Sequence, residues 1–442
     1  MTALRSRRVV TPEGVRPACV VIDGERIQSV APHDSPPPTA TLIEAGDKYV
    51  IPGLVDTHVH INEPGRTEWE GFATATRAAA AGGITTVVDM PLNNLPETTT
   101  VAALDQKRAA ARGRCLVDYG FWGGVVADNQ QHIAALAEAG VLGYKSFLVD
   151  PGIEGFSMVT PEQLEAAVPA VARTGLPLLV HAELPRPIEA AGMSLGSAAD
   201  WTRYSTYLTS RPEAAEVEAI ALLIRLCRRY GVRVHIVHLS AASALPEIRA
   251  ARAEGLPITV ETCPHYLHCS SEQIGDGETL WKCAPPIRNA RNRELLWQAL
   301  REGDIDLIAS DHSPCPPEMK ERGAGDFSQA WGGISSLELG LSIIWTGAVE
   351  RGIGIERVVE WMARGPAGLA GMGGRKGKIA AGYDADLAVF DGDSEFMVDT
   401  GSLHHRHPIT PYAGARLRGV VERTWLRGRQ VGEEPAGVEF GS

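Results

Sequence analysis

Residues 49–60 read YVIPGLVDTHVH, a mostly apolar run that ends in two histidines two positions apart, His58 and His60. On a β-strand, side chains at positions i and i+2 lie on the same face, so both imidazoles point in the same direction. A single histidine in such a strand is more often a hydrogen-bonded core residue than a metal ligand. The pair therefore indicates a metal site only if other ligand types recur where the same site can collect them.

Further apolar segments follow, separated by longer amphipathic segments. The predicted strands cover residues 49–60, 85–90, 115–123, 144–149, 177–183, 233–240, 258–267 and 306–313. The intervening segments, such as TPEQLEAAVPAVARTG (160–175), begin with Thr or Pro and Glu and end at Gly, as helices do. This order predicts an α/β fold of the (β/α)8 TIM-barrel type, although alternation alone also allows a doubly wound open sheet.

The two ends of the chain have a different texture of short strands and turns. Residues 18–32 read ACVVIDGERIQSVAP, with Asp23 and Gly24 as a hairpin signal, and residues 419–431 read GVVERTWLRGRQV. Chain termini often lie close together in a domain. We therefore expect a small β-sandwich domain built from residues 1–50 and 377–442, beside a barrel domain of residues 51–376.

Composition excludes several classes of partner. The net charge of −12 over 442 residues provides no basic footprint for nucleic acid. No window approaches the ~18 uninterrupted apolar residues of a membrane span, and no secretory signal is recognisable. The seven cysteines are scattered without a C-x-x-C pair, which suits reduced thiols. We expect a cytoplasmic protein with a small-molecule substrate and neither a nucleic-acid nor a membrane partner.

Candidate metal ligands lie at the ends of the predicted strands, where a TIM barrel builds its active site. They come from strands 1, 4, 5, 6 and 8 and are His58, His60, Lys145, His181, His238 and Asp311. By strand alternation, His235 is expected outside the barrel and His312 is expected to face away from the metal. We expect His404, His405 and His407 at the surface.

Four histidines and one aspartate exceed one tetrahedral zinc site, and two metals ~3.5–4 Å apart fit them if an anion bridges the pair. The ammonium group of Lys145 is electrostatically unfavourable beside two dications. Either Lys145 is neutral and points elsewhere, or CO2 has carbamylated it to a bridging carboxylate. Its position in the apolar segment YKSFLV (144–149) favours the carbamate.

The sequence motifs that contain these residues resemble those of the cyclic amidohydrolases of the amidohydrolase superfamily, and among these the allantoinases. In chain order they are VIPGLVDTHVHINEPG (50–65), GGITTVVDMPLN (82–93), YKSFL (144–148), LLVHAE (178–183), HIVHLS (235–240), ETCPHYL (261–267), KCAPPIR (282–288), SDHSPCPPEMK (310–320) and KGKIAAGYDADLAVFD (376–391).

The resemblance implies a barrel with a β-sandwich and two divalent metal ions per subunit. His58, His60 and Asp311 would hold one ion and His181 and His238 the other, with N6-carboxylated Lys145 and a hydroxide as bridges. Asp311 would also be the general base. Zinc is the expected metal, and cobalt, manganese or nickel would also suit these ligands. A homotetramer is implied as well, with hydrolysis of allantoin to allantoate in purine catabolism as the expected reaction.

Two departures from related motifs narrow the substrate. Dihydroorotases resemble this chain but carry H-x-H-x-R-x-P-G, in which the arginine binds the substrate carboxylate; Asn62 stands in that place here. Losing the guanidinium removes a bidentate, charge-assisted contact. Hydantoinases carry a tyrosine shortly after the lysine, and residues 145–152 contain none. A neutral ring with a ureido group is consistent with both changes.

Expected substrate contacts are Asn93, Cys283, Ser313 and Gly332, with Gly333 beside it. Asn93 is equally suited to turning the loop after the second strand, and the glycines to turn geometry alone. His265 is either support behind the ligands or a buried histidine. The alternative functions are a hydantoinase of broad specificity and a non-catalytic scaffold related to dihydropyrimidinase.

Overall fold

The structure is a computed structural model that describes residues 1–440. Its strands are β1 Thr2–Thr11, β2 Gly14–Asp23, β3 Arg26–Pro32, β4 Thr41–Pro52, β5 Leu54–Val59, β6 Ile84–Asp89, β7 Asp118–Phe121, β8 Gly123–Gly124, β9 Tyr144–Phe147, β10 Leu178–His181, β11 Val234–Ile236, β12 Ile258–Thr262, β13 Leu307–Ile308, β14 Leu387–Met397, β15 Arg416–Leu426 and β16 Arg429–Gln430.

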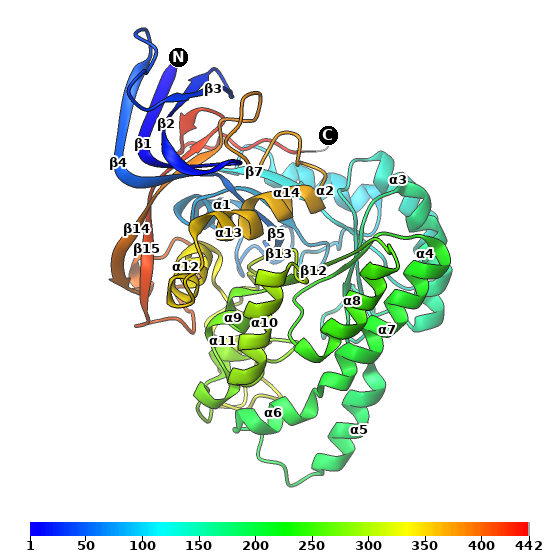
Figure 1. The fold of residues 1–442 in the computed structure, drawn as a ribbon. Coiled ribbons are helices and arrows are strands. Elements are labelled where there is room, and N and C mark those ends of the chain that lie inside the picture. Colours follow the sequence, from blue (N-terminus) through cyan, green and yellow to red (C-terminus); the bar gives the residue numbers. More distant parts are fainter. Residues whose placement is uncertain (441–442) are drawn as a thin grey trace.

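The helices follow the barrel strands and surround them (Figure 1). They are α1 Phe72–Ala81, α2 Val101–Ala111, α3 Ile133–Glu138, α4 Pro161–Thr174, α5 Pro185–Leu195, α6 Tyr204–Ser210, α7 Glu213–Tyr230, α8 Leu245–Ala253, α9 Pro264–His268, α10 Ala290–Glu302, α11 Pro317–Lys320, α12 Gly340–Glu350, α13 Ile355–Val359 and α14 Gly365–Leu369. Within residues 1–440, no helix is both long enough and apolar enough to cross a bilayer.

Parallel pairing closes the barrel in chain order. β5, β6 and β7 form one sheet, and β8 to β13 form the other. β7 and β8 follow each other in the chain with only Trp122 between them, so the two sheets meet there. A parallel bridge joins Val59 to His312, and the His60 amide donates to the His312 carbonyl at 2.8 Å, which brings β5 beside the segment after β13. The prediction of a (β/α)8 barrel over an open sheet is therefore confirmed.

Local signals place the helices as the sequence pattern predicts. In α4, Thr160 caps the N-terminus through a capping box with Gln163, and Gly175 ends the helix in the left-handed conformation. The apolar face of α4 joins the main buried cluster through residues such as Leu164 and Val168. Burial of each such side chain contributes roughly 1.5–3 kcal/mol relative to exposure, which is what holds the helix layer on the barrel.

The two ends of the chain build one seven-stranded sheet, in the order β16-β15-β14-β4-β1-β2-β3. N-terminal strand β4 pairs antiparallel with C-terminal strand β14. Side chains from strands across the sheet, including Val20 of β2, Val50 of β4 and Trp425 of β15, share one buried cluster, so the sheet curves around its own core. The expected small β domain made from both termini is thus present, and we propose the limits 1–50 with 377–442 for it.

The observed strands differ in bounds from the predicted ones, and two of the predicted strands include part of a second element. Residues 49–60 are not one strand, because β4 ends at Pro52 in the terminal sheet and β5 begins at Leu54 in the barrel. Gly53 lies between them, where a Cβ atom would come within 2.2 Å of the Thr85 hydroxyl. The strand predicted at 258–267 ends at Thr262, since Pro264 starts helix α9.

Candidate metal-dependent active site

A cavity of about 570 Å³ opens at the C-terminal ends of the barrel strands. His58, His60, His181, His238 and Asp311 all line it. Five of the six residues predicted as ligands from separate motifs therefore meet in one cavity. The sixth, Lys145, lies on β9 two residues before Phe147, which also lines the cavity.

The first ligand group consists of His58, His60 and Asp311, whose donor atoms lie within 4.8 Å of one another. The Asp311 Oδ1 atom is 3.2 Å from His58 Nε2 and 3.5 Å from His60 Nε2. Burial alone would raise the pKa of the Asp311 carboxyl, but the His58 charge and a hydrogen bond with His60 lower it to about 2. Burial lowers the pKa of His60 to about 4. At neutral pH the group therefore presents a carboxylate and a neutral imidazole.

The second ligand group brings His181 and His238 together, with His181 Nδ1 and His238 Nε2 3.1 Å apart. Burial lowers the pKa of both imidazoles, so both nitrogens keep lone pairs for a metal at neutral pH. Phe147 stacks on the His181 ring at a centroid distance of 4.7 Å and fixes its plane. These contacts orient the pair toward one point in the cavity.

Lys145 is fully buried, and among residues 1–440 its Nζ atom has no hydrogen-bond partner. Burial lowers the pKa of this amine to about 8, against the opposing effect of Glu261 and Asp311. An unsatisfied buried polar group costs about 1–3 kcal/mol, and more if it is charged. The four imidazoles and the carboxylate are suited to holding divalent metal ions. The unpaired amine of Lys145 leaves a place for one further, anionic ligand.

Two buried glutamates orient the ligand histidines. Glu183 accepts a hydrogen bond from His181 Nε2 at 2.7 Å, which leaves Nδ1 for a metal. Glu261 contacts His58 Nδ1 through one oxygen and lies 3.0 Å from His235 Nε2 through the other. Such partners fix the tautomer and raise the basicity of the ligand. Neither glutamate was predicted, although Glu183 lies only two residues after His181, just beyond the end of β10.

His235 corrects one prediction. It is fully buried and bonds to Glu261, so it is not outside the barrel. The β-register pairs Lys145 with Leu179 and Leu179 with His235, which puts His235 on the same inward face as Lys145. Alternation from His238 fails because β11 ends at Ile236 and His238 has a φ of 38°.

The predicted positions of the other histidines are confirmed except for that of His405. His312 does face away from the ligands, since its Nε2 lies 3.3 Å from Glu70 and its Nδ1 accepts backbone hydrogen bonds from Ser336 and Leu337. His404 is exposed and His407 is partly exposed, as expected for surface residues. His405 is buried against His312 instead, with ring centroids 5.7 Å apart, so its surface prediction is wrong.

Strained backbone marks the same cavity. Asn93, His238 and Asp311 have φ values of 68°, 38° and 46°, in the left-handed region that non-glycine residues rarely adopt. Asn62, four residues after His58, has a φ of 66°. Each such residue costs of order 1–3 kcal/mol unless its surroundings stabilise it, and such residues concentrate at functional sites.

The residues predicted to contact substrate all line the cavity, and each makes different contacts within the protein. The Asn93 Nδ2 and His60 Nδ1 atoms lie 3.2 Å apart. The Cys283 carbonyl accepts a hydrogen bond from Tyr207 at 2.7 Å. Ser313 and Gly332 lie on the wall, and neighbouring Gly333 leaves no room for a Cβ atom, which would lie 2.5 Å from the Ser313 carbonyl. Their roles toward substrate remain predictions.

The far wall of the cavity was not predicted. Tyr207 and Arg211 of the α6 region, Lys282 and Trp331 line it, and none belongs to the ligand pattern. Arg211 is paired with Glu183, whereas Lys282 donates to the carbonyl of Ala330 and its burial lowers the pKa of the amine to about 8. The only sequence signal for this wall was that Lys282 stands directly before Cys283, a predicted substrate contact, in the segment KCAPPIR.

Replacing Glu261 with glutamine is expected to weaken metal binding by about 10–100-fold, because His58 loses the carboxylate that fixes its tautomer. Metal content after dialysis against graded chelator concentrations measures the effect. Glu216→Gln is the matched control, since Glu216 is equally buried but bonds to Arg288 and backbone amides instead of a ligand. Equal metal retention by Glu261→Gln and Glu216→Gln would contradict this role.

Both the sequence and the fold of this chain match those of known proteins. Residues 49–431 match the Amidohydrolase family. The chain is 51% identical over 429 residues to the allantoinase of Streptomyces avermitilis, covering 97% of this chain and 94% of that one. It is 45% identical over 445 residues to the allantoinase of Arabidopsis thaliana, covering 97% and 87%. The solved L-hydantoinase (dihydropyrimidinase) of Arthrobacter aurescens superposes with a TM-score of 0.94 at 31% identity over 100% of both chains. With its barrel, its terminal β domain and its clustered ligands, this chain belongs to the amidohydrolase family.

Proposed function

We propose that the protein hydrolyses the hydantoin ring of allantoin to give allantoate. The observation that carries the proposal is the convergence of two ligand groups, His58/His60/Asp311 and His181/His238, around the orphan amine of Lys145. The names of the two sequence relatives supply the substrate. Asn62, in place of an arginine, supports a substrate without a carboxylate.

We propose two divalent metal ions per subunit, held by the two ligand groups and joined by N6-carboxylated Lys145. The amine has the required properties, since it is buried, unpaired within residues 1–440 and partly neutral at neutral pH. Zinc is the proposed metal, because imidazole and carboxylate ligands suit it. Bound ions of this kind lower the pKa of water toward ~7 and polarise a carbonyl oxygen.

Asp311 is the proposed proton carrier. As a carboxylate with a pKa of about 2, it is ready at neutral pH to accept the proton from the attacking water. While the new C–O bond forms at the ring carbonyl and the ring C–N bond breaks, Asp311 passes this proton to the departing nitrogen. The second proton of the water stays on the new carboxyl group and is then released to solvent, so the product carries a carboxylate and a free ureido nitrogen and atoms and charge balance.

Two further properties belong to the proposal. A cytoplasmic location is supported by the seven cysteines, all free and buried. The homotetramer stays a prediction that analytical ultracentrifugation checks.

The test is turnover of allantoin, hydantoin, dihydrouracil and dihydroorotate by protein expressed with added zinc and bicarbonate. We expect kcat/KM for allantoin to exceed the others by at least about tenfold, or ~1.4 kcal/mol. Preference for hydantoin or dihydrouracil would instead support a hydantoinase, the alternative that the Arthrobacter structure favours. Metal content well below one ion per chain after reconstitution would support a scaffold.

Asn62→Arg is expected to weaken allantoin binding without creating dihydroorotase activity. Asn62 is buried, donates to the Pro314 carbonyl at 3.3 Å and does not line the cavity, so an arginine there must displace its neighbours before it reaches a substrate. KM for allantoin should rise several-fold. Asn62→Gly is the control, because glycine keeps the left-handed backbone without a new side chain. Efficient dihydroorotate hydrolysis by Asn62→Arg would show that this one position sets the substrate.

A further inference from the structure

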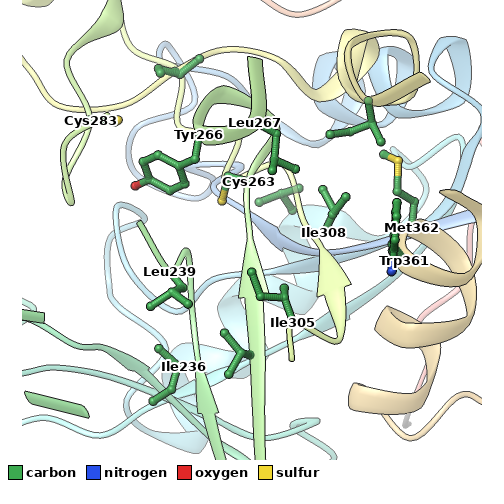
Figure 2. Close-up of a cluster of buried hydrophobic side chains, with 14 of the residues drawn as sticks. Ile236, Leu239, Cys263, Tyr266, Leu267, Cys283, Ile305, Ile308, Trp361 and Met362 are labelled. Atoms are coloured by element: carbon green, nitrogen blue, oxygen red, sulfur yellow. The ribbon is translucent and has the colours of Figure 1, made fainter. Parts of the chain in front are cut away.

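A second group of metal-ligating atoms lies beside the first and uses different chemistry. The donor atoms of Cys263, His265 and Asp311 lie within 4.8 Å of one another, and all three residues are buried. Cys263 follows the last residue of β12 and caps α9, so its position is set by the barrel itself. Figure 2 shows Cys263 among Leu239, Tyr266 and Leu267 at the end of this strand.

His265 is the unexplained member of this group. Its side chain is 0% exposed, and neither ring nitrogen has a hydrogen-bond partner in the described part of the chain. The Tyr266 ring packs against it in an edge contact at 4.1 Å, which does not satisfy a ring nitrogen. A buried imidazole with two unsatisfied nitrogens costs free energy and requires an explanation. Its nitrogen shares a ligand-sized space with the Cys263 sulfur and an Asp311 oxygen.

The donor set of one sulfur, one nitrogen and one carboxylate oxygen is typical of zinc and of softer divalent ions. Zinc bonds of about 2.3 Å to sulfur and 2.0–2.2 Å to nitrogen and oxygen place tetrahedral ligands roughly 3.3–3.8 Å apart. Atoms already within 4.8 Å of one another therefore need movements of only about 1 Å or less.

We infer that Cys263, His265 and Asp311 form an inhibitory binding site for a thiophilic divalent cation. On binding, the Cys263 S–H bond breaks, the sulfur bonds to the cation and the proton passes to solvent. Because Asp311 also belongs to the first ligand group, one carboxylate oxygen would stay with that group while the other binds the cation, and the carboxylate could then no longer accept a proton. Binding itself is independent of the proposed function, and only the inhibition rests on it.

Cadmium(II) provides a probe that separates this site from the two metals of the proposed active site. The ligands His58, His60, Lys145, His181, His238 and Asp311 include no sulfur, so cadmium that replaced zinc there would give no thiolate-to-metal charge-transfer absorption. Titration of the zinc-loaded protein with cadmium, followed by ultraviolet difference absorption and by metal content, reports the thiolate directly. We expect one thiolate-bound cadmium per chain, loss of at least about nine-tenths of allantoin turnover and retention of both zinc ions.

Cys283→Ser is the matched control. Cys283 is also buried and lines the cavity, but its sulfur contacts the Pro285 carbonyl at 3.4 Å and lies outside the donor group. Cys263→Ser and His265→Gln should each lose the absorption and at least tenfold in cadmium affinity, whereas Cys283→Ser should keep both. For each variant, turnover with cadmium is divided by turnover of the same variant without cadmium, so a change in basal rate does not affect the measured inhibition. If Cys263→Ser folds poorly, His265→Gln still provides the test.

The inference is overturned if cadmium gives no thiolate absorption before zinc is displaced, or if the absorption survives Cys263→Ser and disappears in Cys283→Ser. Thiolate binding by a protein that is inactive toward allantoin would confirm the cation site while rejecting the proposed function. Allantoin turnover without a thiolate signal would support the proposed function and reject the cation site.

Discussion

Lys145→Ala is expected to lower allantoin turnover by about 10³-fold or more, equivalent to ~4 kcal/mol of transition-state stabilisation. The lysine is the only proposed source of a bridging carboxylate, and its fully buried Nζ has no other partner within residues 1–440. Loss of the bridge should also reduce the metal content to fewer than two ions per chain. The fold should persist, with a stability loss on the order of 2 kcal/mol from the cavity left behind.

Three measurements test the Lys145 prediction. Turnover and metal content are measured together, and carbon-13 NMR of protein loaded with labelled bicarbonate should show a carbamate carbon in the wild type only. Added acetate or propionate is the control, because a small carboxylate fits the space left by the lysine chain and should restore part of the activity. An alanine variant with two metals and near-normal turnover would reject the carbamate.

Asp311→Asn should lower kcat/KM by about 10²–10⁴-fold, because the amide cannot carry the proton from water to the leaving nitrogen. The substitution keeps the size of the side chain but removes the negative charge that His58 and His60 stabilise. Assays with excess zinc keep the site loaded, so that the loss reports proton transfer and not metal loss. Asp311→Glu, which keeps the charge but moves it by one methylene, should retain more activity than asparagine. A rate for Asp311→Asn within threefold of wild type would assign the proton transfer to another residue.

The ligands were predictable because a TIM barrel collects the ends of its strands at one face. His58, His181, His238 and Asp311 come from different motifs, yet each lies within the last two residues of a strand or just after one, and that position brought them together. The barrel itself was predictable from the alternation of apolar strands and capped helices. The composite terminal domain followed from similar β-rich texture at both ends.

Features set by side-chain pairing and local backbone geometry were not predictable. The inward direction of His235 depends on the β-register and on the left-handed residue His238, which breaks the simple alternation of faces. The role of Glu261 depends on two histidines that are 203 and 26 residues away in sequence. His405 is buried because its loop packs on His312, a tertiary contact without a periodic pattern.

The terminal sheet has a consequence for synthesis of the protein on the ribosome. Strand β4 is complete at Pro52, but its neighbour β14 begins only at Leu387. At about 5–20 residues per second, one edge of β4 waits tens of seconds for its partner. An unpaired strand edge is a template for aggregation. The last part of the chain is therefore needed to protect the first, and expression of this protein should depend on chaperones that cover nascent chains and should suffer sharply from C-terminal truncation.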